Sequence, residues 1–80
     1  MSVTVLLFAS YADALGTSRL SVDVADGATV SDVLGRLRER AGARELPPKP
    51  LVAVNEQYAG TDQALRSGDT LAIIPPVAGG

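Results

Sequence analysis

The chain opens with a nearly unbroken apolar and β-branched run, SVTVLLF, over residues 2–8. Such a run is typical of a strand that is buried on both faces, so it predicts a central strand. Residues 10–15 can form a short turn of helix, which Gly16 is placed to end in a left-handed conformation. Residues 20–24 then alternate between apolar and polar positions, and this alternation predicts a second, half-buried strand.

The most regular pattern begins at Thr29. Thr29 is placed to cap a helix, and Asp32 three positions later completes a variant of the capping box. Gly42 is placed to end this helix. Apolar residues recur at helical spacing between these limits and form one stripe: Val30, Val33, Leu34, Leu37 and Ala41. The arginines at positions 36, 38, 40 and 44 lie off the stripe, where they form either a solvated helix face or a site for an anionic partner.

The second half of the chain predicts three more strands. Residues 46–50 hold three prolines, which remove backbone donors and exclude both helix and central strand, so this segment is a stiff loop. Residues 51–54 form a short apolar strand, Asn55-Glu56 a tight turn, and residues 57–59 the returning strand. Residues 70–74 are strongly apolar and predict a last strand.

The order of these elements, ββαβββ, predicts an α+β protein with the β-grasp fold. Its mixed sheet has four to five strands, and one long helix packs across it. The first and last strands are the most apolar, so we expect them to lie side by side and parallel at the centre. Eighty residues favour one domain, residues 1–74, followed by an extended tail, residues 75–80.

The first strand carries two sets of apolar side chains because successive residues point to opposite faces. Val3, Val5 and Leu7 share one face, and Leu6 and Phe8 share the other. We expect one set to pack under the helix. The other set either completes the core or forms part of an exposed apolar patch that binds partners.

Composition removes several classes of function. The chain has no Cys and no His, so it offers no thiolate nucleophile, no cysteine metal site and no imidazole for proton transfer near neutral pH. Its net charge of -2 has the wrong sign for general nucleic-acid binding. The acidic residues are scattered over turns and caps without metal-ligand spacing. The longest apolar run is too short to span a bilayer, and the first residues lack the pattern of a signal peptide, so we expect a cytoplasmic protein.

The last six residues, PPVAGG, are the candidate for chemistry. Pro75 and Pro76 favour an extended backbone that projects away from the domain. Val77, Ala78, Gly79 and Gly80 are small enough to enter a narrow channel, and a terminal glycine leaves its carboxylate uncrowded. ATP could activate that carboxylate as an acyl-adenylate, which a sulfur nucleophile from outside would convert to a thiocarboxylate. The alternative is a terminus that ends in two glycines by chance or as a cloning remnant.

Two segments resemble the MoaD/ThiS family of ubiquitin-like sulfur carriers, and within it the MoaD branch. One is residues 65–80, in which a Gly-Asp turn and an apolar strand are followed by Pro-Pro-Val-Ala-Gly-Gly; the other is residues 8–16. The resemblance covers essentially the whole chain. It implies the small, sulfur-carrying subunit of molybdopterin synthase, which is not itself catalytic.

The resemblance also implies partners and residue roles. An E1-like enzyme would adenylate Gly80 with ATP and Mg²⁺, and no cofactor would be bound permanently. Residues 75–79 would thread into the large subunit, which carries the catalytic side chains, in a heterotetramer of two large and two small subunits. Sulfur would pass from Gly80 to cyclic pyranopterin monophosphate, and two deliveries would form the molybdopterin dithiolene. Apolar residues on the last two strands dock partners in the family, which points to Tyr58 and Ile74. Tyr58 stands where an aliphatic residue is usual, and the alternative is an ordinary half-buried tyrosine with its hydroxyl in water. Phe8, from the possible apolar patch on the first strand, is a further candidate.

Three other functions fit the same residues. Related carriers serve the thiamine, cysteine and tRNA-thiolation pathways with the same activation chemistry. A β-grasp module could bind partners without covalent chemistry at its tail. Gly80 could also be conjugated to lysines, as in ubiquitin.

Overall fold

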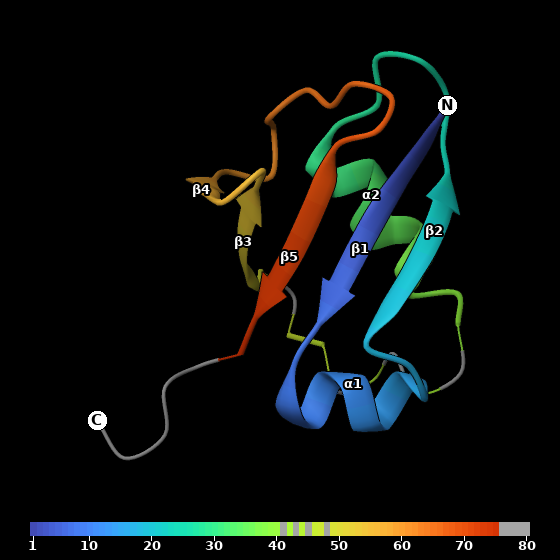
Figure 1. Cartoon of the computed structure of the whole chain (residues 1–80), viewed down its shortest axis with the longest axis vertical. Helices are drawn as coiled ribbons and strands as arrows, with labels where there is room; N and C mark the ends of the chain where they lie inside the picture. The colour runs from blue at the N-terminus through green and yellow to red at the C-terminus, as the bar shows by residue number, and fades with distance from the viewer. Residues whose placement is uncertain (41, 43, 45, 48, 76–80) are drawn as a thin grey trace.

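The five strands form one mixed sheet, with two short helices beside it (Figure 1). This computed structural model describes residues 1–40, 42, 44, 46–47 and 49–75. The elements are β1 (Ser2–Leu7), α1 (Ala9–Leu15), β2 (Arg19–Asp23), α2 (Val30–Leu37), β3 (Leu51–Val54), β4 (Gln57–Ala59) and β5 (Thr70–Ile74). The strand order is β2-β1-β5-β3-β4. The predicted strands, the predicted short helix before Gly16 and the α+β β-grasp arrangement are therefore confirmed.

The centre of the sheet is the parallel pair β1 and β5, as predicted. Val5 pairs with Leu71, and Leu7 pairs with Ile73. The outer pairs β1–β2, β5–β3 and β3–β4 are antiparallel. Because β5 is paired on both sides along its length, the segment that follows it starts from the most firmly held part of the sheet.

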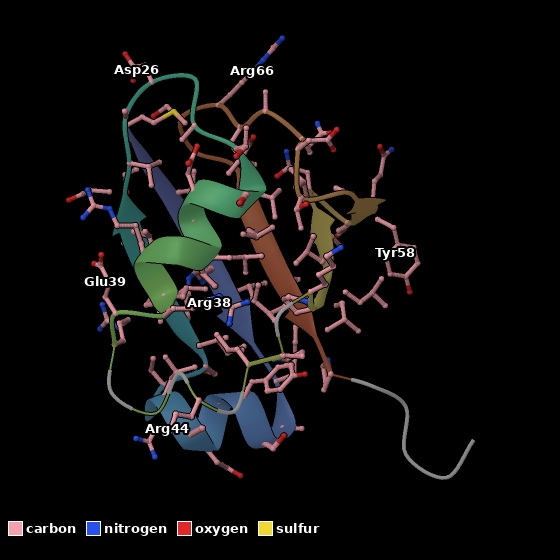
Figure 2. The ribbon with its side chains drawn as sticks, turned by 180° about the vertical axis from the view of Figure 1, so that it is seen from behind. Asp26, Arg38, Glu39, Arg44, Tyr58 and Arg66 are labelled. Carbon is pink, nitrogen blue, oxygen red and sulfur yellow. The ribbon has the colours of Figure 1, made fainter. Side chains whose placement is uncertain are left out.

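Helix α2 lies across one face of the sheet and covers the core (Figure 2). At its start, the Thr29 N–H donates to Asp32 Oδ2 at 2.8 Å and the Asp32 N–H donates to Thr29 Oγ1 at 3.4 Å. This reciprocal pair is the predicted capping box. Side chains from α2 and from the covered face of β1 and β5 are almost fully buried: Val30, Val33, Leu34, Leu37, Val3, Val5, Leu7, Leu71 and Ile73.

The predicted long helix is wrong in its length. Helix α2 ends at Leu37, four residues before the predicted end, and α1 is a second helix of nearly equal length. After Leu37 the backbone tightens, since the Arg40 N–H donates to the Leu37 carbonyl three residues back. The Arg38 guanidinium donates to the carbonyls of Leu46 and Pro47, which ties the end of α2 to the following loop. Gly42 has a positive φ of 86° but caps no helix, and Ala41 lies outside the described residues.

The prediction that the first strand is buried on both faces is also wrong. On β1, Val3, Val5 and Leu7 are at most 1% exposed, whereas Thr4 and Leu6 on the other face are half-buried. Helix α2 covers the first face, and α1 lies at the end of the sheet (Figure 1). No described element covers the second face. The sheet therefore has one open face, and the apolar side chains on it are accessible.

Candidate functional site

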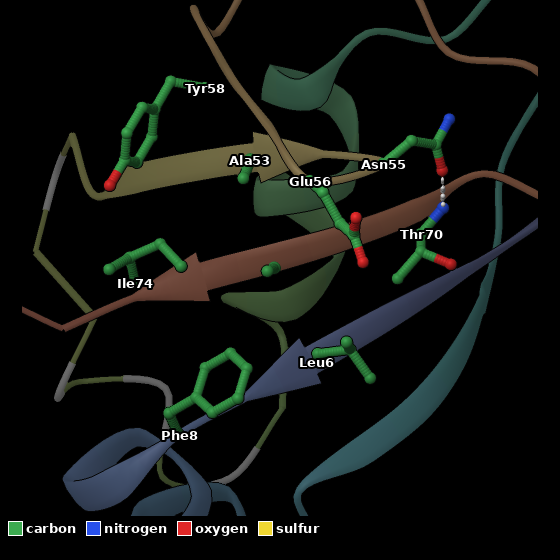
Figure 3. A pocket seen from close by; sticks show the side chains of 9 residues that line it. Leu6, Phe8, Ala53, Asn55, Glu56, Tyr58, Thr70 and Ile74 are labelled. Atoms are coloured by element: carbon green, nitrogen blue, oxygen red, sulfur yellow. Dashed lines mark hydrogen bonds between the residues drawn. The ribbon is translucent and has the colours of Figure 1, made fainter.

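The open face holds a shallow hollow of about 720 Å³ over β1, β5, β3 and β4 (Figure 3). Six of its lining side chains are apolar in whole or large part: Leu6, Phe8, Ala53, Tyr58, Ala72 and Ile74. Asn55, Glu56 and Thr70 line the rest. The hollow is thus an apolar surface with one polar end.

Strand register explains the shape of this hollow. Leu6 pairs with Ala72, Ala72 with Ala53, and Ala53 with Tyr58, so one row of side chains crosses four strands. Directly opposed residues share a face of the sheet. The two alanines in the middle are small and form the floor, whereas Leu6 and Tyr58 stand at the two ends of the row.

The structure brings together the three residues that were predicted to bind partners. Phe8 is 44% exposed and Tyr58 is 76% exposed, while Ile74 is half-buried between them on the same face (Figure 3). Leu51 is opposite Ile74 and 52% exposed, and it extends this apolar surface. Large exposed apolar groups that cluster in this way are typical of protein-binding surfaces. Their role in binding stays a prediction.

The polar end of the hollow is fixed by hydrogen bonds around Asn55. Asn55 Oδ1 accepts from the Thr70 N–H and Asn55 Nδ2 donates to Asp69 Oδ1, both at 3.0 Å. Asp69 Oδ2 also accepts from the Arg66 N–H at 2.8 Å. The Arg66 backbone donor, followed by the Asn55 amide, lowers the pKa of Asp69 from its ordinary value of 3.8. These bonds join the β3–β4 turn to the start of β5.

Backbone strain gathers around the hollow. The described non-glycine residues with positive φ are Ala9, Asn55 and Glu56, at 49°, 50° and 72°. Asn55 and Glu56 line the hollow, and Ala9 follows the lining residue Phe8. A left-handed conformation costs an ordinary residue about 1–2 kcal/mol, and such strain tends to persist at functional sites.

Glu56 is a lining residue that the sequence analysis missed, because Asn55-Glu56 was interpreted only as a tight turn. The signal in the sequence was a glutamate at a turn position where glycine is usual. A two-residue hairpin turn with positive φ at both positions strongly prefers glycine at the second.

The predicted tail falls mostly outside the described residues. Pro75 is described and follows β5 directly, whereas Pro76, Val77, Ala78, Gly79 and Gly80 lie outside. Ile74 pairs with Leu51, and Ile73 pairs with both Leu7 and Val52. The tail therefore starts one residue after Ile74, which is held in the sheet and lines the hollow.

The described residues offer little for catalysis or metal binding. They include no group of three or more His, Cys, Asp or Glu side chains that could hold a metal ion. None of the helices in the described part of the chain has the length and hydropathy to cross a membrane. The feature that these residues do form is an exposed apolar surface next to Pro75.

Comparisons with known proteins agree with this description. A family model described as the ThiS family matches residues 5–80. Over the whole chain, the protein is 40% identical to the molybdopterin synthase sulfur carrier subunit of Drosophila erecta, covering 92% of that protein. It is 34% identical to the subunit of the same name from Chlamydomonas reinhardtii, with both chains fully covered.

A solved structure shows the same fold. The crystal structure of SAMP1, a small archaeal modifier protein from Haloferax volcanii, superposes with a TM-score of 0.87 at 35% identity, and both chains are fully covered. The match therefore includes all the strands that build the open face. With the ubiquitin-like β-grasp fold and a family match that extends from β1 to residue 80, the chain belongs to the ThiS family.

Proposed function

We propose that this chain is the sulfur-carrier subunit of a molybdopterin synthase. The observation that carries the proposal is the 40% identity over the whole chain to a subunit of that name. The family match runs through residue 80, so the Gly-Gly tail is included in it. The apolar hollow beside Pro75 supports the proposal, since a carrier must bind an enzyme while its tail reaches the active site.

The chemistry takes place on the carboxylate of Gly80. An E1-like enzyme with ATP and Mg²⁺ forms the acyl-adenylate and releases pyrophosphate. A sulfur nucleophile at the oxidation level of sulfide then attacks the acyl carbon, AMP leaves, and Gly80 becomes a thiocarboxylate. In the synthase, this sulfur attacks a side-chain carbon of cyclic pyranopterin monophosphate, and the oxygen substituent of that carbon leaves as the carbon–sulfur bond forms. Water then cleaves the acyl–sulfur bond, which leaves the sulfur on the pterin and regenerates the Gly80 carboxylate. Two deliveries supply the two sulfurs of the dithiolene.

The residues of this chain bind the large subunit and position the tail. In this proposal Phe8, Tyr58 and Ile74 dock the large subunit, and Pro75 and Pro76 direct the extended segment through Val77 and Ala78 into it. Gly79 allows close passage, and the catalytic side chains belong to the large subunit. The heterotetramer, the E1-like enzyme and the cytoplasmic location stay predictions.

The test is intact-mass spectrometry after incubation with ATP, Mg²⁺, an E1-like activating enzyme and a sulfur source. We expect a mass gain equal to the exchange of one oxygen for sulfur. Because oxidation of Met1 adds nearly the same mass, fragmentation must place the gain on Gly80, and heavy-isotope sulfur must shift it. The loaded chain should then convert cyclic pyranopterin monophosphate in the presence of the large subunit. A carboxylate that stays unmodified with several competent activating enzymes would refute the carrier role.

A second candidate function is conjugation, which the similarity to an archaeal modifier protein favours. Conjugation would join the activated Gly80 to a lysine amine as an isopeptide. Peptide mapping of proteins from cells that express the tagged chain distinguishes the two functions. Isopeptide adducts that depend on Gly80 would favour conjugation, and a thiocarboxylate without adducts would favour the sulfur carrier.

A further inference from the structure

Glu56 is held in a conformation that its side chain does nothing to stabilise. Its φ of 72° lies in the region that favours glycine. The neighbouring Asn55 has a similar φ, but its side chain makes two hydrogen bonds to the start of β5. Within the described part of the chain, the Glu56 carboxylate has no hydrogen-bond or ion-pair partner. Among the described residues, no contact of its side chain therefore accounts for a glutamate at this position.

The Glu56 side chain instead reaches over the open face. It extends from the β3–β4 turn to the side of the sheet that carries Tyr58, Ile74 and Phe8 (Figure 3). Among the nine lining residues it is the only one that is charged at neutral pH. A protein that covers the hollow must remove water from this carboxylate as well as from the apolar groups.

Burial of an unpaired carboxylate is costly, whereas a cation placed against it offsets the loss of water. The charge of Glu56 therefore discriminates against apolar partners that carry no cation, and it favours those that do. A residue with a positive φ that lines an exposed hollow fits the tendency of backbone strain to persist at functional sites.

We propose that Glu56 selects the docking partner: the partner surface presents an apolar side chain to the alanine floor and an Arg or Lys to the Glu56 carboxylate. This inference rests on the proposed function, because it takes the partner to be the large subunit of molybdopterin synthase. Ala53 and Ala72 leave room for the apolar group, and Glu56 stands at the polar end of the same hollow.

The experiment measures binding of the full chain to the large subunit of the same organism by calorimetry, at low and at high salt. Three variants are compared with the wild type: Glu56→Gln, Glu56→Lys and the control Glu39→Gln. Glu39 lies at the opposite edge of the molecule from Tyr58 and is exposed (Figure 2), so its variant changes net charge equally without touching the hollow. Far-UV circular dichroism checks that every variant folds.

We expect Glu56→Gln to raise Kd about tenfold and to reduce its salt dependence, because a charge pair at the interface is lost. Glu56→Lys should weaken binding further, and Glu39→Gln should leave Kd unchanged. If the wild type binds and Glu56→Gln changes neither Kd nor its salt dependence, this inference is overturned and the proposed function stands. Absence of wild-type binding would overturn the proposed function, and this inference with it. A salt-sensitive homodimer that Glu56→Gln dissociates would show that the occupant is a second copy, which also overturns the assignment.

Discussion

The open face of the sheet can be tested with two leucines that differ in burial. Leu71 on β5 is 0% exposed and points into the core, whereas Leu51 on β3 is 52% exposed on the other face. Replacing a fully buried leucine by alanine loses about 2.4 kcal/mol of transfer free energy, at about 0.8 kcal/mol for each buried methylene. A cavity adds to this loss, so we expect Leu71→Ala to lower the free energy of unfolding by about 3–4 kcal/mol.

Leu51→Ala should cost much less. About half of its side chain is already in water, so the transfer term falls to about 1 kcal/mol. Water fills the vacated space at once, and no cavity term is added. The two variants should therefore differ by about 2 kcal/mol or more, a large share of the roughly 5–15 kcal/mol that stabilises a domain.

Urea unfolding followed by far-UV circular dichroism measures both values, which suits a chain without Trp. Measurements at several protein concentrations control for self-association through the open face. Equal losses for the two variants, independent of concentration, would refute the conclusion that this face is open. Leu51→Ala should also weaken binding of the large subunit, although it hardly affects the fold.

Three further predictions concern local features. Thr29→Ala removes the capping box of α2 and should cost about 1 kcal/mol in urea unfolding. Glu56→Gly relieves the left-handed strain, and the greater backbone entropy that glycine loses on folding offsets part of this gain. The free energy of unfolding should rise by about 0.5–1 kcal/mol, and a decrease would contradict the strain at Glu56. The folded-state pKa of Asp69 is lowered, so its contribution to stability is present above the unfolded-state pKa and is lost as the pH falls through the folded one. Asn55→Ala should raise the pKa of Asp69 in an NMR titration and flatten this acid dependence.

Local signals in the sequence were enough to predict most elements. The start of α2 is marked in the sequence by its capping residues Thr29 and Asp32, and the strands follow from β-branched and alternating residues. The end of α2 could not be predicted in this way. At this end Arg38 bonds to the carbonyls of Leu46 and Pro47, eight and nine residues away, and an apolar stripe contains no information on such contacts.

The candidate site shows a similar limit. Tyr58 and Ile74 were predicted from the family resemblance and Phe8 from the two faces of the first strand, but their meeting around one hollow depends on the register of four strands. An apolar strand such as β1 does not reveal whether a second layer covers its other face. Glu56 was missed because turn propensity explains why a chain reverses, and does not show where the side chain at the turn points.

The open face of the sheet is where the proposed preference for one partner would arise. In the proposed function, the activation of Gly80 would be the same for the sulfur carriers of several pathways, so this step would not distinguish one acceptor enzyme from another. A row of apolar side chains from Leu6 to Tyr58 supplies area that any apolar partner surface can bury, so this area does little to select one partner. The charge of Glu56 beside that row selects more strongly. A partner without a matching cation leaves the buried Glu56 carboxylate unpaired, which weakens its binding. The affinity for partners in general should therefore lie in the apolar row, and the preference for one acceptor enzyme in Glu56.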